Sequence, residues 1–470
     1  MEKVTSDITI HVPPPGLGAR HGQAALLFLC MVLMFCMRAN MSLAVVGMVA
    51  VQPQRDPPAA DFSWDAQQQA VLLSSFFWGY VCTQIPAAQL ARAWGGKRLL
   101  LGAMAVNAAV CWLLPLAARA GGFALVCACR ILQGLTQAGL YPAVHHLISQ
   151  WVPPQEQGLL GSIIYSGSVL GIALQQLGGG WLAARWGWAA IFYADALLAS
   201  LWALLYLRLG AAAPEQARLQ PRELAYIQAA CSRTGEQEVH PTPWLEIASS
   251  RPFWALVAAH CGQNWGFFTL MTEVPTYMAT VLKFDIKSNG IFSCLPYLAM
   301  YVLSLALGAA ADAAVRRRWL SLTAQRKLSN TIGLWGSAGM LVALAYCSDV
   351  RAAVAALTAA VALNAGIFTG FMLNHMDLAP NFSASLMGVS NFLANIVSVV
   401  APLVCGKILH EQSDPVLAWR LVFVVAALVY VACNLVFLLL GTARRQRWDA
   451  PPDQDDLELS STRKINSTER

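Results

Sequence analysis

Charge is scarce in this sequence. Only 12% of its 470 residues are Asp, Glu, Lys or Arg, whereas soluble domains carry about 25%. Hydrophobic residues make up 57%, and apolar runs such as VFVVAALVYVACNLVFLLLG (422–441) reach the roughly 20 residues that cross a bilayer. A single water-soluble core cannot hold so much apolar surface, so the composition excludes a soluble globular protein and predicts an integral membrane protein.

Three further patterns are missing. The apolar runs are continuous and do not alternate with polar residues, which excludes a membrane β-barrel and predicts an all-α fold. The first twenty residues are polar and include the run Pro13–Pro15, so we expect no cleavable signal peptide and an uncleaved amino terminus. Most of the twelve cysteines fall inside apolar runs, where we interpret them as small hydrophobic residues rather than disulfide partners.

Polar breaks separate twelve apolar segments, so the predicted fold is an all-α polytopic membrane protein with twelve transmembrane helices in two six-helix bundles. The predicted spans are 24–49, 70–91, 98–118, 122–150, 157–182, 188–208, 252–281, 288–313, 327–347, 352–377, 383–408 and 418–441. The chain is accordingly divided into an amino-terminal tail (1–22), a first bundle (23–208), a linker (209–250), a second bundle (251–441) and a carboxyl-terminal tail (442–470).

Basic residues are distributed unevenly between the two sides of these spans. Of the 31 Lys and Arg residues, 21 fall on the side of the termini and eight on the opposite side, which leaves Arg38 and Arg130 inside spans. Because cytosolic loops are enriched in Lys and Arg, we expect both termini in the cytosol. This topology and a lipid bilayer account for the net charge of +6 without a nucleic-acid partner.

The ends of spans two and eight are similar to each other. AAQLARAWGGKR aligns with GAAADAAVRRR, which places Ala88 on Gly308 and Arg92 on Asp312, each followed by a basic cluster. Transporters built from two parallel repeats carry such a duplicated loop at the same place in each six-helix half. The alignment therefore agrees with two halves of six helices.

The two arginines inside spans are candidates for binding an anion. An arginine at the centre of a spanning helix costs about 2.5–3.5 kcal/mol on insertion scales, so it normally faces a water-filled cavity or a partner. No carboxylate lies within one helical turn of Arg38 or Arg130. The alternative is that backbone carbonyls or interfacial phosphates satisfy both guanidinium groups.

The fourth predicted span carries a polar stripe. At 100° per residue, Gln137 and Tyr141 fall within about 20° of Arg130, and Gln133 and His145 lie about 60° to either side. Such a face is expected to line a cavity, although Gln and Tyr also hydrogen-bond between packed helices. We predict that Arg130, Gln133, Gln137 and Tyr141 bind the substrate together with Arg38.

Several other titratable residues are candidates for coupling or gating. Asp195 and Glu273 lie toward the non-cytosolic ends of their spans, where they either bind a proton or cation or simply sit at the membrane interface. His375 and Asp377, in LNHMDLAP, end span ten, where they form either a helix-end polar cluster or a gate, and His145 is a further candidate. A membrane enzyme is the rival class, but the sequence has no nucleotide loop, metal-ligand spacing or nucleophile elbow. We predict no enzyme, no bound metal and no cofactor other than co-transported Na⁺ or H⁺.

Seven sequence pieces point to a known family. They are, in order from span one to the tail, RANMSLAVVGMV, SSFFWGYVCTQIPA, RILQGLTQAGLYPA, NWGFFTLMTEVPTYM, RKLSNTIG, NHMDLAPNFSASLMGVSNF and RQRWDAP. In these pieces the chain resembles the anion:cation symporter family of the major facilitator superfamily, which includes sialin, the vesicular glutamate transporters and the sodium/phosphate cotransporters. TQAGLYPA and NFSASLMGVSN look most like its arthropod branch, whose members are usually labelled putative inorganic phosphate cotransporters.

The resemblance implies two six-helix bundles, a central site and rocker-type alternating access, with Arg38 and Arg130 at the basic positions that contact the anion. Three residues depart from the family pattern. Gln137 stands where proton-coupled relatives have Glu, and Leu73 and Gln263 stand where glutamate transporters have His and Arg. Vesicular glutamate transport and the proton-coupling mechanism of sialin therefore do not carry over, and sodium coupling or coupling through another group stays open.

From these patterns we predict a symporter that moves a small anion, such as inorganic phosphate or an organic anion, with sodium or protons. A facilitator or a non-transporting anion sensor on the same fold is the alternative. We expect a monomer in the plasma membrane rather than in a lysosomal or vesicular membrane.

Overall fold

The computed structural model describes residues 16–49, 61–217, 219–231, 241–280, 286–347 and 349–449. These residues form helices and no strands. The first half contains α2 (Ala19–Val49), α3 (Ala66–Trp94), α4 (Gly96–Gln137), α5 (Leu140–Trp151), α6 (Gln157–Leu174), α7 (Gly180–Trp186) and α8 (Ala189–Leu209). The linker contains α9 (Pro221–Ala230) and α10 (Trp244–Ser249).

Within the described residues the second half contains nine α-helices: α11 (Arg251–Thr280), α12 (Ile286–Arg316), α13 (Leu322–Thr331), α14 (Ser337–Ala345), α15 (Val350–Leu363), α16 (Gly366–Thr369), α17 (Phe371–Leu378), α18 (Ser383–Glu411) and, as the last transmembrane element, α19 (Pro415–Leu440). Two π-helical turns, 175–179 and 332–336, join α6 to α7 and α13 to α14. Each half therefore contains one span that is interrupted by a π turn.

The number of membrane passes agrees with the sequence. Ten segments of the described chain are long and apolar enough to cross a membrane. One of them, Gly96–Trp151, holds two passes, because the backbone of Gly122 leaves the helical region (φ 55°, ψ −143°) and the chain turns back there. α11 adds a pass of 30 residues. The prediction of twelve transmembrane helices in an all-α fold is confirmed.

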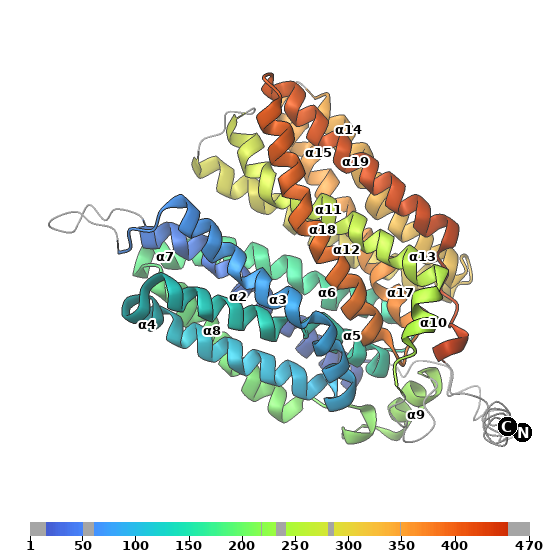
Figure 1. Cartoon of the computed structure of the whole chain (residues 1–470). Helices are drawn as coiled ribbons and strands as arrows, with labels where there is room; N and C mark the ends of the chain where they lie inside the picture. The colour runs from blue at the N-terminus through green and yellow to red at the C-terminus, as the bar shows by residue number, and fades with distance from the viewer. Residues whose placement is uncertain are drawn as a thin grey trace, which may run out of the picture.

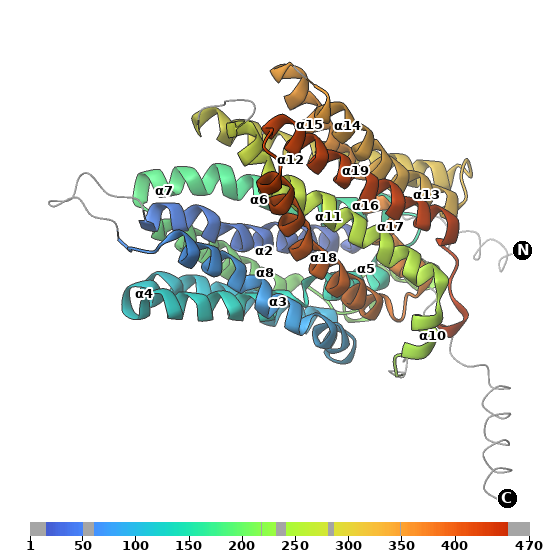
Figure 2. The same cartoon turned by 45° about the horizontal axis from the view of Figure 1, so that its top comes forward.

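The two halves pack side by side, and α2 begins at the same end of the molecule at which α19 ends (Figures 1 and 2). We call this end the terminal face and the opposite end the far face. The halves touch along α6 against α12 and along α3 against α18. Their helices lie close together near the terminal face and diverge toward the far face (Figure 1).

Small residues allow both of these helix pairs to approach closely. A Cβ atom added to Gly308 of α12 would lie 2.8 Å from the carbonyl oxygen of Gly158 in α6, and one added to Gly388 of α18 would lie 2.5 Å from the Cβ of Ala88 in α3. We call these contacts the two crossings. Ala88 and Gly308 are the residues that the sequence alignment of the halves paired, and they occupy equivalent places in the structure.

Each crossing is reinforced by a charged residue from the duplicated loop. The carboxylate of Asp312 accepts hydrogen bonds from the backbone N–H groups of Gly158 (2.7 Å) and Leu159 (2.8 Å), at the start of α6. A carboxylate is favourable there because the amino terminus of a helix carries partial positive charge. In the other crossing the guanidinium of Arg92 lies 4.4 Å from the ring centre of Phe382, at the start of α18. The terminal face is thus closed twice by related contacts.

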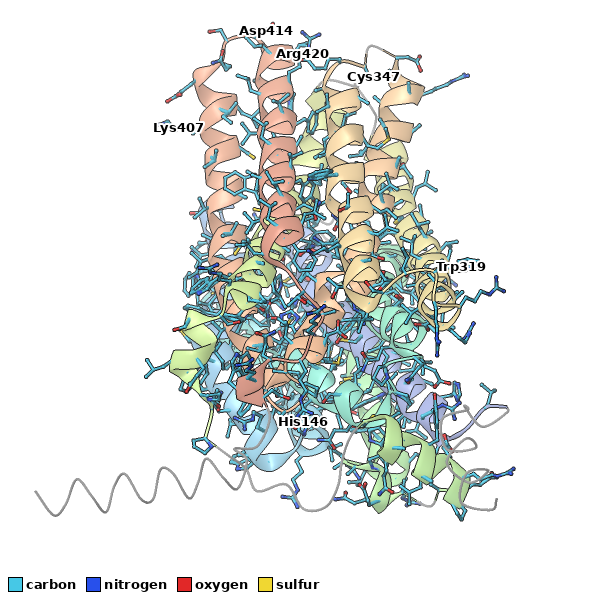
Figure 3. All side chains as sticks on the ribbon, turned by 90° about the vertical axis from the view of Figure 1, so that its right-hand side faces the viewer. His146, Trp319, Cys347, Lys407, Asp414 and Arg420 are labelled. Atoms are coloured by element: carbon cyan, nitrogen blue, oxygen red, sulfur yellow. The ribbon has the colours of Figure 1, made fainter. Side chains whose placement is uncertain are left out.

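Charged side chains of the second half collect at the ends of its helices. Figure 3 shows Cys347, Lys407, Asp414 and Arg420 at the far face, with His146 near the opposite end. Exposed leucines, valines and tryptophans cover much of the surface between the ends of the molecule. This distribution is the one that a bilayer requires of a chain that crosses it many times.

The linker is attached to the first half through a buried arginine. Arg20 is 2% exposed, and its guanidinium pairs with Glu156, before α6 (2.7 Å), and with Glu223 of α9 (3.1 Å). Gln23 adds a hydrogen bond from its side-chain amide to the carbonyl of Leu209 (2.9 Å). α9 therefore belongs structurally to the first half.

Replacing Arg20 with alanine should destabilise the protein strongly. The substitution leaves Glu156 and Glu223 without their cation, and breaking a buried ion pair from one side costs about 3–5 kcal/mol. We expect the unfolding temperature of the detergent-solubilised protein to fall by several degrees. Arg208→Ala, which removes an exposed arginine from the last turn of α8, should leave it unchanged; equal unfolding temperatures for both variants would contradict the anchoring role.

The segment after α19 is attached to the second half. Asp449 accepts a hydrogen bond from the backbone N–H of Asn381 (3.0 Å) and pairs with Arg445 (2.6 Å), and the ring of Trp448 lies 6.2 Å from that of Phe382. Burial raises the pKa of Asp449 to about 6, while Arg445 and the backbone N–H groups act in the opposite direction. The segment thus covers the turn between α17 and α18.

Candidate functional site

A cavity lies between the two halves near the middle of the molecule. It encloses about 650 Å³ of empty space, including the part that is open to solvent. Its lining comes from α2, α3, α5, α6, α11, α12, α16, α17 and α18, and consists of Phe35, Arg38, Tyr80, Tyr141, Ser168, Val169, Ile172, His260, Gln263, Asn264, Phe267, Phe268, Met300, Ile367, Phe368, Met372, Met387, Asn391 and Asn395. Among the described residues of this lining, Arg38 is the cation and none is a carboxylate.

Arg38 stands in a group of aromatic rings. Its guanidinium carbon lies 4.5 Å from the ring centres of Phe35 and Tyr80 and 5.0 Å from that of Phe76. Phe35 lies one helical turn before Arg38, so both face the same side of α2. The Nε and Nη2 atoms of Arg38 are buried without a hydrogen-bond acceptor. Buried N–H groups nearly always have an acceptor, so these two nitrogens of Arg38 have unused hydrogen-bonding capacity.

Arg130 lies behind this wall, with 3% of its surface exposed. It donates to the carbonyl oxygen of Arg38 (3.3 Å) and to the side-chain oxygen of Gln133 (3.0 Å), and its guanidinium carbon lies 5.0 Å from the ring centre of Phe76. The ring of Phe76 is thus shared by both guanidinium groups. Arg130 holds the backbone of α2 at the point where Arg38 enters the cavity, and its own Nε remains without an acceptor.

The structure divides the polar stripe of the fourth span. Tyr141 lines the cavity and packs edge-on against Phe35, with ring centres 6.1 Å apart. Gln133 and Gln137 are fully buried and point toward the first arm of α4, where Gln137 donates to Asn107 (2.9 Å). Among the five residues predicted to bind substrate, Arg38 and Tyr141 face the cavity, whereas Arg130, Gln133 and Gln137 support it from behind.

The second half contributes a wall of side-chain amides. Gln263 and Asn264 of α11 face the cavity, and so do Asn391 and Asn395, which are one turn apart on α18. Asn391 also donates to the hydroxyl of Tyr80 across the two halves (3.0 Å). Sequence reasoning missed the α18 pair; the spacing of the two asparagines in SNFLANIVS was the signal that indicated one polar face.

Three histidines form the floor of the cavity on the side of the terminal face. The rings of His145 and His375 lie 5.1 Å apart and those of His260 and His375 6.2 Å apart. Ser390 lies 2.8 Å from Nε2 of His375 and 3.2 Å from Nδ1 of His260, and Nε2 of His145 lies 3.0 Å from the carbonyl oxygen of Met372 in the other half. This layer joins the halves directly below the cavity.

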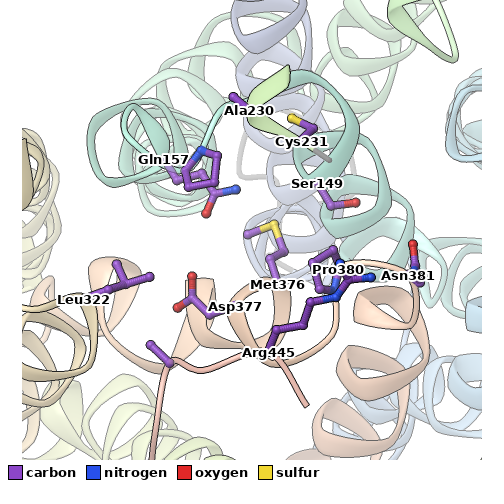
Figure 4. A pocket seen from close by; sticks show the side chains of 12 residues that line it. Ser149, Gln157, Ala230, Cys231, Leu322, Met376, Asp377, Pro380, Asn381 and Arg445 are labelled. Atoms are coloured by element: carbon purple, nitrogen blue, oxygen red, sulfur yellow. The ribbon is translucent and has the colours of Figure 1, made fainter. Parts of the chain in front are cut away.

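A second cavity lies on the other side of this floor, at the terminal face (Figure 4). Its walls come from α5, α6, α9, α13, α17 and the segment after α19, and its empty volume is about 820 Å³, including open solvent. Met372 faces the central cavity and Met376, one turn later on α17, faces the second one. The fully buried Asn374 and His375 lie between them, so one turn of α17 separates the two spaces.

Asp377 lines the second cavity and forms a buried ion pair with Arg326 (2.7 Å). Glu273 lies in α11, but its side chain is outside the described part of the structure. Asp195 is 6% exposed and lies in the core of the first half, where the amide of Asn40 donates to its carboxylate (2.9 Å).

Comparison with known proteins identifies the family. The family model described as Major Facilitator Superfamily matches residues 27–402. The chain belongs to this superfamily. Within it, the transporter is 39% identical over 464 residues to a Drosophila ananassae protein named "Putative inorganic phosphate cotransporter", covering 93% of this chain and 96% of that protein. It is 33% identical to human sialin (93% and 92% covered) and 29% identical to human vesicular glutamate transporter 2 (94% and 77% covered).

The transporter also has the fold of a solved relative. The proton:xylose symporter XylE bound to 6-bromo-6-deoxy-D-glucose matches it with a TM-score of 0.69 at 15% identity, over 90% of this chain and 96% of that chain. The predicted resemblance to the anion:cation symporter family is confirmed by the named relatives. The protein is therefore a multi-pass membrane transporter of a small molecule and not an enzyme.

Proposed function

We propose that this transporter moves a small anion, either inorganic phosphate or a small organic anion, by cation-coupled alternating access. One observation carries the proposal. Arg38 extends a guanidinium into the central cavity with two buried nitrogens that lack acceptors, and none of the described residues that line this cavity is a carboxylate. An anion supplies both the acceptors and the missing negative charge.

The bound anion would lie between Arg38 and the amide wall. A guanidinium presents a planar fork of donors that matches the geometry of phosphate and carboxylate. The side-chain amides of Gln263, Asn264, Asn391 and Asn395 offer further donors and acceptors to the oxygens of the cargo. The aromatic rings around Arg38 exclude water, which strengthens the charge pair. Arg130 positions α2 and adds positive potential from behind.

Two named relatives support an anionic cargo. The names of the Drosophila phosphate cotransporter and of the vesicular glutamate transporters both refer to anions. Neither name assigns the cargo of this chain. Phosphate is the first candidate because the protein with that name is the more similar of the two, at 39% against 29% identity.

The closed floor and the two crossings suggest how access alternates. With the histidine layer and both crossings formed, the cavity is closed toward the terminal face. Opening that face requires α6 to leave α12 and α3 to leave α18 while each half moves as a body. We propose that His145, His375 and Asp377 take part in this gate, with Glu273 as a further candidate for coupling.

We further propose that the terminal face is cytosolic, because most Lys and Arg residues are on that side. In this proposal the tail 1–22, the linker 209–250 and the tail 442–470 are cytosolic, and residues 23–208 and 251–441 are the moving bundles. The proposed location is the plasma membrane and the proposed state is a monomer. A facilitator or a sensor with the same anion site is the alternative function.

Transport in proteoliposomes tests the proposal. The purified full-length protein is reconstituted and offered labelled phosphate, sialate, glutamate and urate, each under a sodium gradient and separately under a proton gradient. Accumulation of one anion under one gradient supports a symporter and identifies its coupling ion. Equilibration without accumulation supports a facilitator, binding without movement supports a sensor, and no interaction with any anion rejects the anion site.

A further inference from the structure

A carboxylate without a cation lies in the core of the first half. Asp195 of α8 is 6% exposed, and it takes part in none of the ion pairs among the described residues. Its Oδ2 atom accepts from the side-chain amides of Asn40 (2.9 Å) and Gln175 (3.4 Å). Burying an unpaired carboxylate is costly, and the anion-binding mechanism described above does not use it.

Two features of the surroundings mark the site as unusual. Gln175 opens the π-helical turn 175–179, and such turns inside α-helices occur frequently at functional sites. The side-chain oxygen of Asn40 is buried without a partner, although its amide nitrogen is bonded to Asp195.

The site is connected to the anion site by a chain of polar contacts. From Asp195 the chain passes through Asn40 to the sulfur of Cys111 (3.9 Å), which also accepts from Gln133 (3.4 Å). Gln133 in turn accepts from Arg130 (3.0 Å), the arginine behind Arg38. Every side chain between Asp195 and Arg130 in this chain is at least nine-tenths buried.

We propose that Asp195 is the residue that takes up the co-transported proton. The proposal rests on the anion-transport function above and adds its coupling site. The other titratable groups near Asp195 are Cys36 of α2 and Cys111 of α4, and the cation nearest to it along the chain of contacts is Arg130. None of these three groups (Cys36, Cys111 and Arg130) can take the role of Asp195, which is to lose and gain a negative charge.

The geometry fits a proton better than a sodium ion. A hard cation takes about six oxygen ligands, whereas the site offers the carboxylate of Asp195 and one free amide oxygen, that of Asn40. Hydrogen-bond donors from Asn40 and Gln175 stabilise the ionised carboxylate, so the proton can leave again.

Electrostatics links the proton to the anion. An ionised Asp195 lowers the positive potential that Arg130 and Arg38 create at the cavity. Protonation of Asp195 removes this negative charge from a medium of low dielectric constant, which raises the affinity of the Arg38 site for an anion. By linkage, the bound anion raises proton affinity by the same factor. A symporter needs this coupling between proton binding and anion binding. With Asp195 as the proton site, the coupling does not require an acidic residue in place of Gln137.

Two transport assays separate coupling from anion binding. Wild type, Asp195→Asn and Asp195→Glu are reconstituted, with Asp349→Asn, which retains the helix-capping chemistry at the start of α15, as the matched control. The first assay measures accumulation of labelled phosphate, sialate, glutamate and urate under an inward proton gradient. The second measures exchange of the same anion across the membrane without a gradient.

We expect Asp195→Asn to lose accumulation by about tenfold or more while its exchange rate stays within about threefold of wild type. Asp195→Glu should recover part of the accumulation, and Asp349→Asn should match wild type in both assays. If Asp195→Asn accumulates the anion at the wild-type level, the assignment is overturned. It is also overturned if the variant is folded but its exchange rate falls by the same factor as its accumulation.

If wild type exchanges none of the four anions, that result counts against the transport function itself. A third measurement then tests the proton site independently of transport. Infrared difference spectra of the full-length protein are recorded while the pH is changed across roughly pH 5 to 8. We expect a protonated-carboxyl band in wild type that is absent in Asp195→Asn and shifted in Asp195→Glu. A band that persists in Asp195→Asn overturns the assignment independently of transport.

Discussion

Arg38→Gln should reduce anion uptake by roughly 100-fold or more. Hydrogen bonds to charged groups contribute about 1.5–3 kcal/mol each, and the variant also leaves the anion in a low-dielectric cavity without its countercharge. A loss of about 3 kcal/mol corresponds to roughly 100-fold in affinity. The initial rate of uptake into proteoliposomes, measured with the best anion of the panel, checks this expectation.

Two further variants show whether the effect belongs to the anion site. Arg185→Gln removes an exposed arginine near the far face and should leave uptake unchanged. Arg130→Gln should reduce uptake and also lower the unfolding temperature, because Arg130 donates to the backbone of α2. Arg38→Gln should keep the wild-type unfolding temperature. Wild-type uptake by Arg38→Gln would remove the basis of the proposed function.

Gly158→Leu and Gly388→Leu should each stop the transport cycle with the terminal face open. The new side chain at Gly158 meets the carboxylate of Asp312, and the one at Gly388 meets Ala88. Excess volume in a packed contact costs about 1–3 kcal/mol, and a cost of that size shifts a two-state equilibrium by about 5-fold to 150-fold. Both crossings form only when the terminal face is closed. The substitutions therefore destabilise the closed state and leave the open state unaffected.

The trapped state can be measured directly. Ser149→Cys places a reporter in the cavity at the terminal face, and its alkylation by a membrane-impermeant reagent should become faster in both glycine variants while exchange slows about tenfold. Gly406→Leu is the control on the same helix as Gly388, because no atom lies within 4 Å of a Cβ added there. Slow alkylation in the two variants would contradict the crossings as the closing contacts.

The fold could be predicted almost completely from the sequence, because each span must satisfy its own backbone hydrogen bonds in the bilayer. Apolar length therefore determines the number of helices, and the alignment of Ala88 with Gly308 identified the residues at both crossings. The turn at Gly122 was expected as a short break between spans. The π turns had no signal in the pattern of apolar and polar residues.

The candidate site could be predicted only in part. Helical angles place Arg130, Gln133, Gln137 and Tyr141 on one face. They do not show which other helix or cavity each of these residues contacts. Tyr141 meets the cavity, whereas Gln137 meets Asn107 of the antiparallel arm of α4. The histidine floor combines residues from three helices in both halves, and no pattern within a single helix predicts such a layer.

At the terminal face, α9 and the segment after α19 are each attached to one half of the molecule, so the distance between them follows the relative movement of the halves. α9 is held by the first half through Arg20 and Glu223, and Asp449 holds the last described segment to the second half at Asn381. A donor fluorophore on α9 and an acceptor beside Asp449 would each follow one rigid body. Their energy-transfer efficiency would report every rocking step of a single molecule in real time, without a label in the cavity or in either crossing.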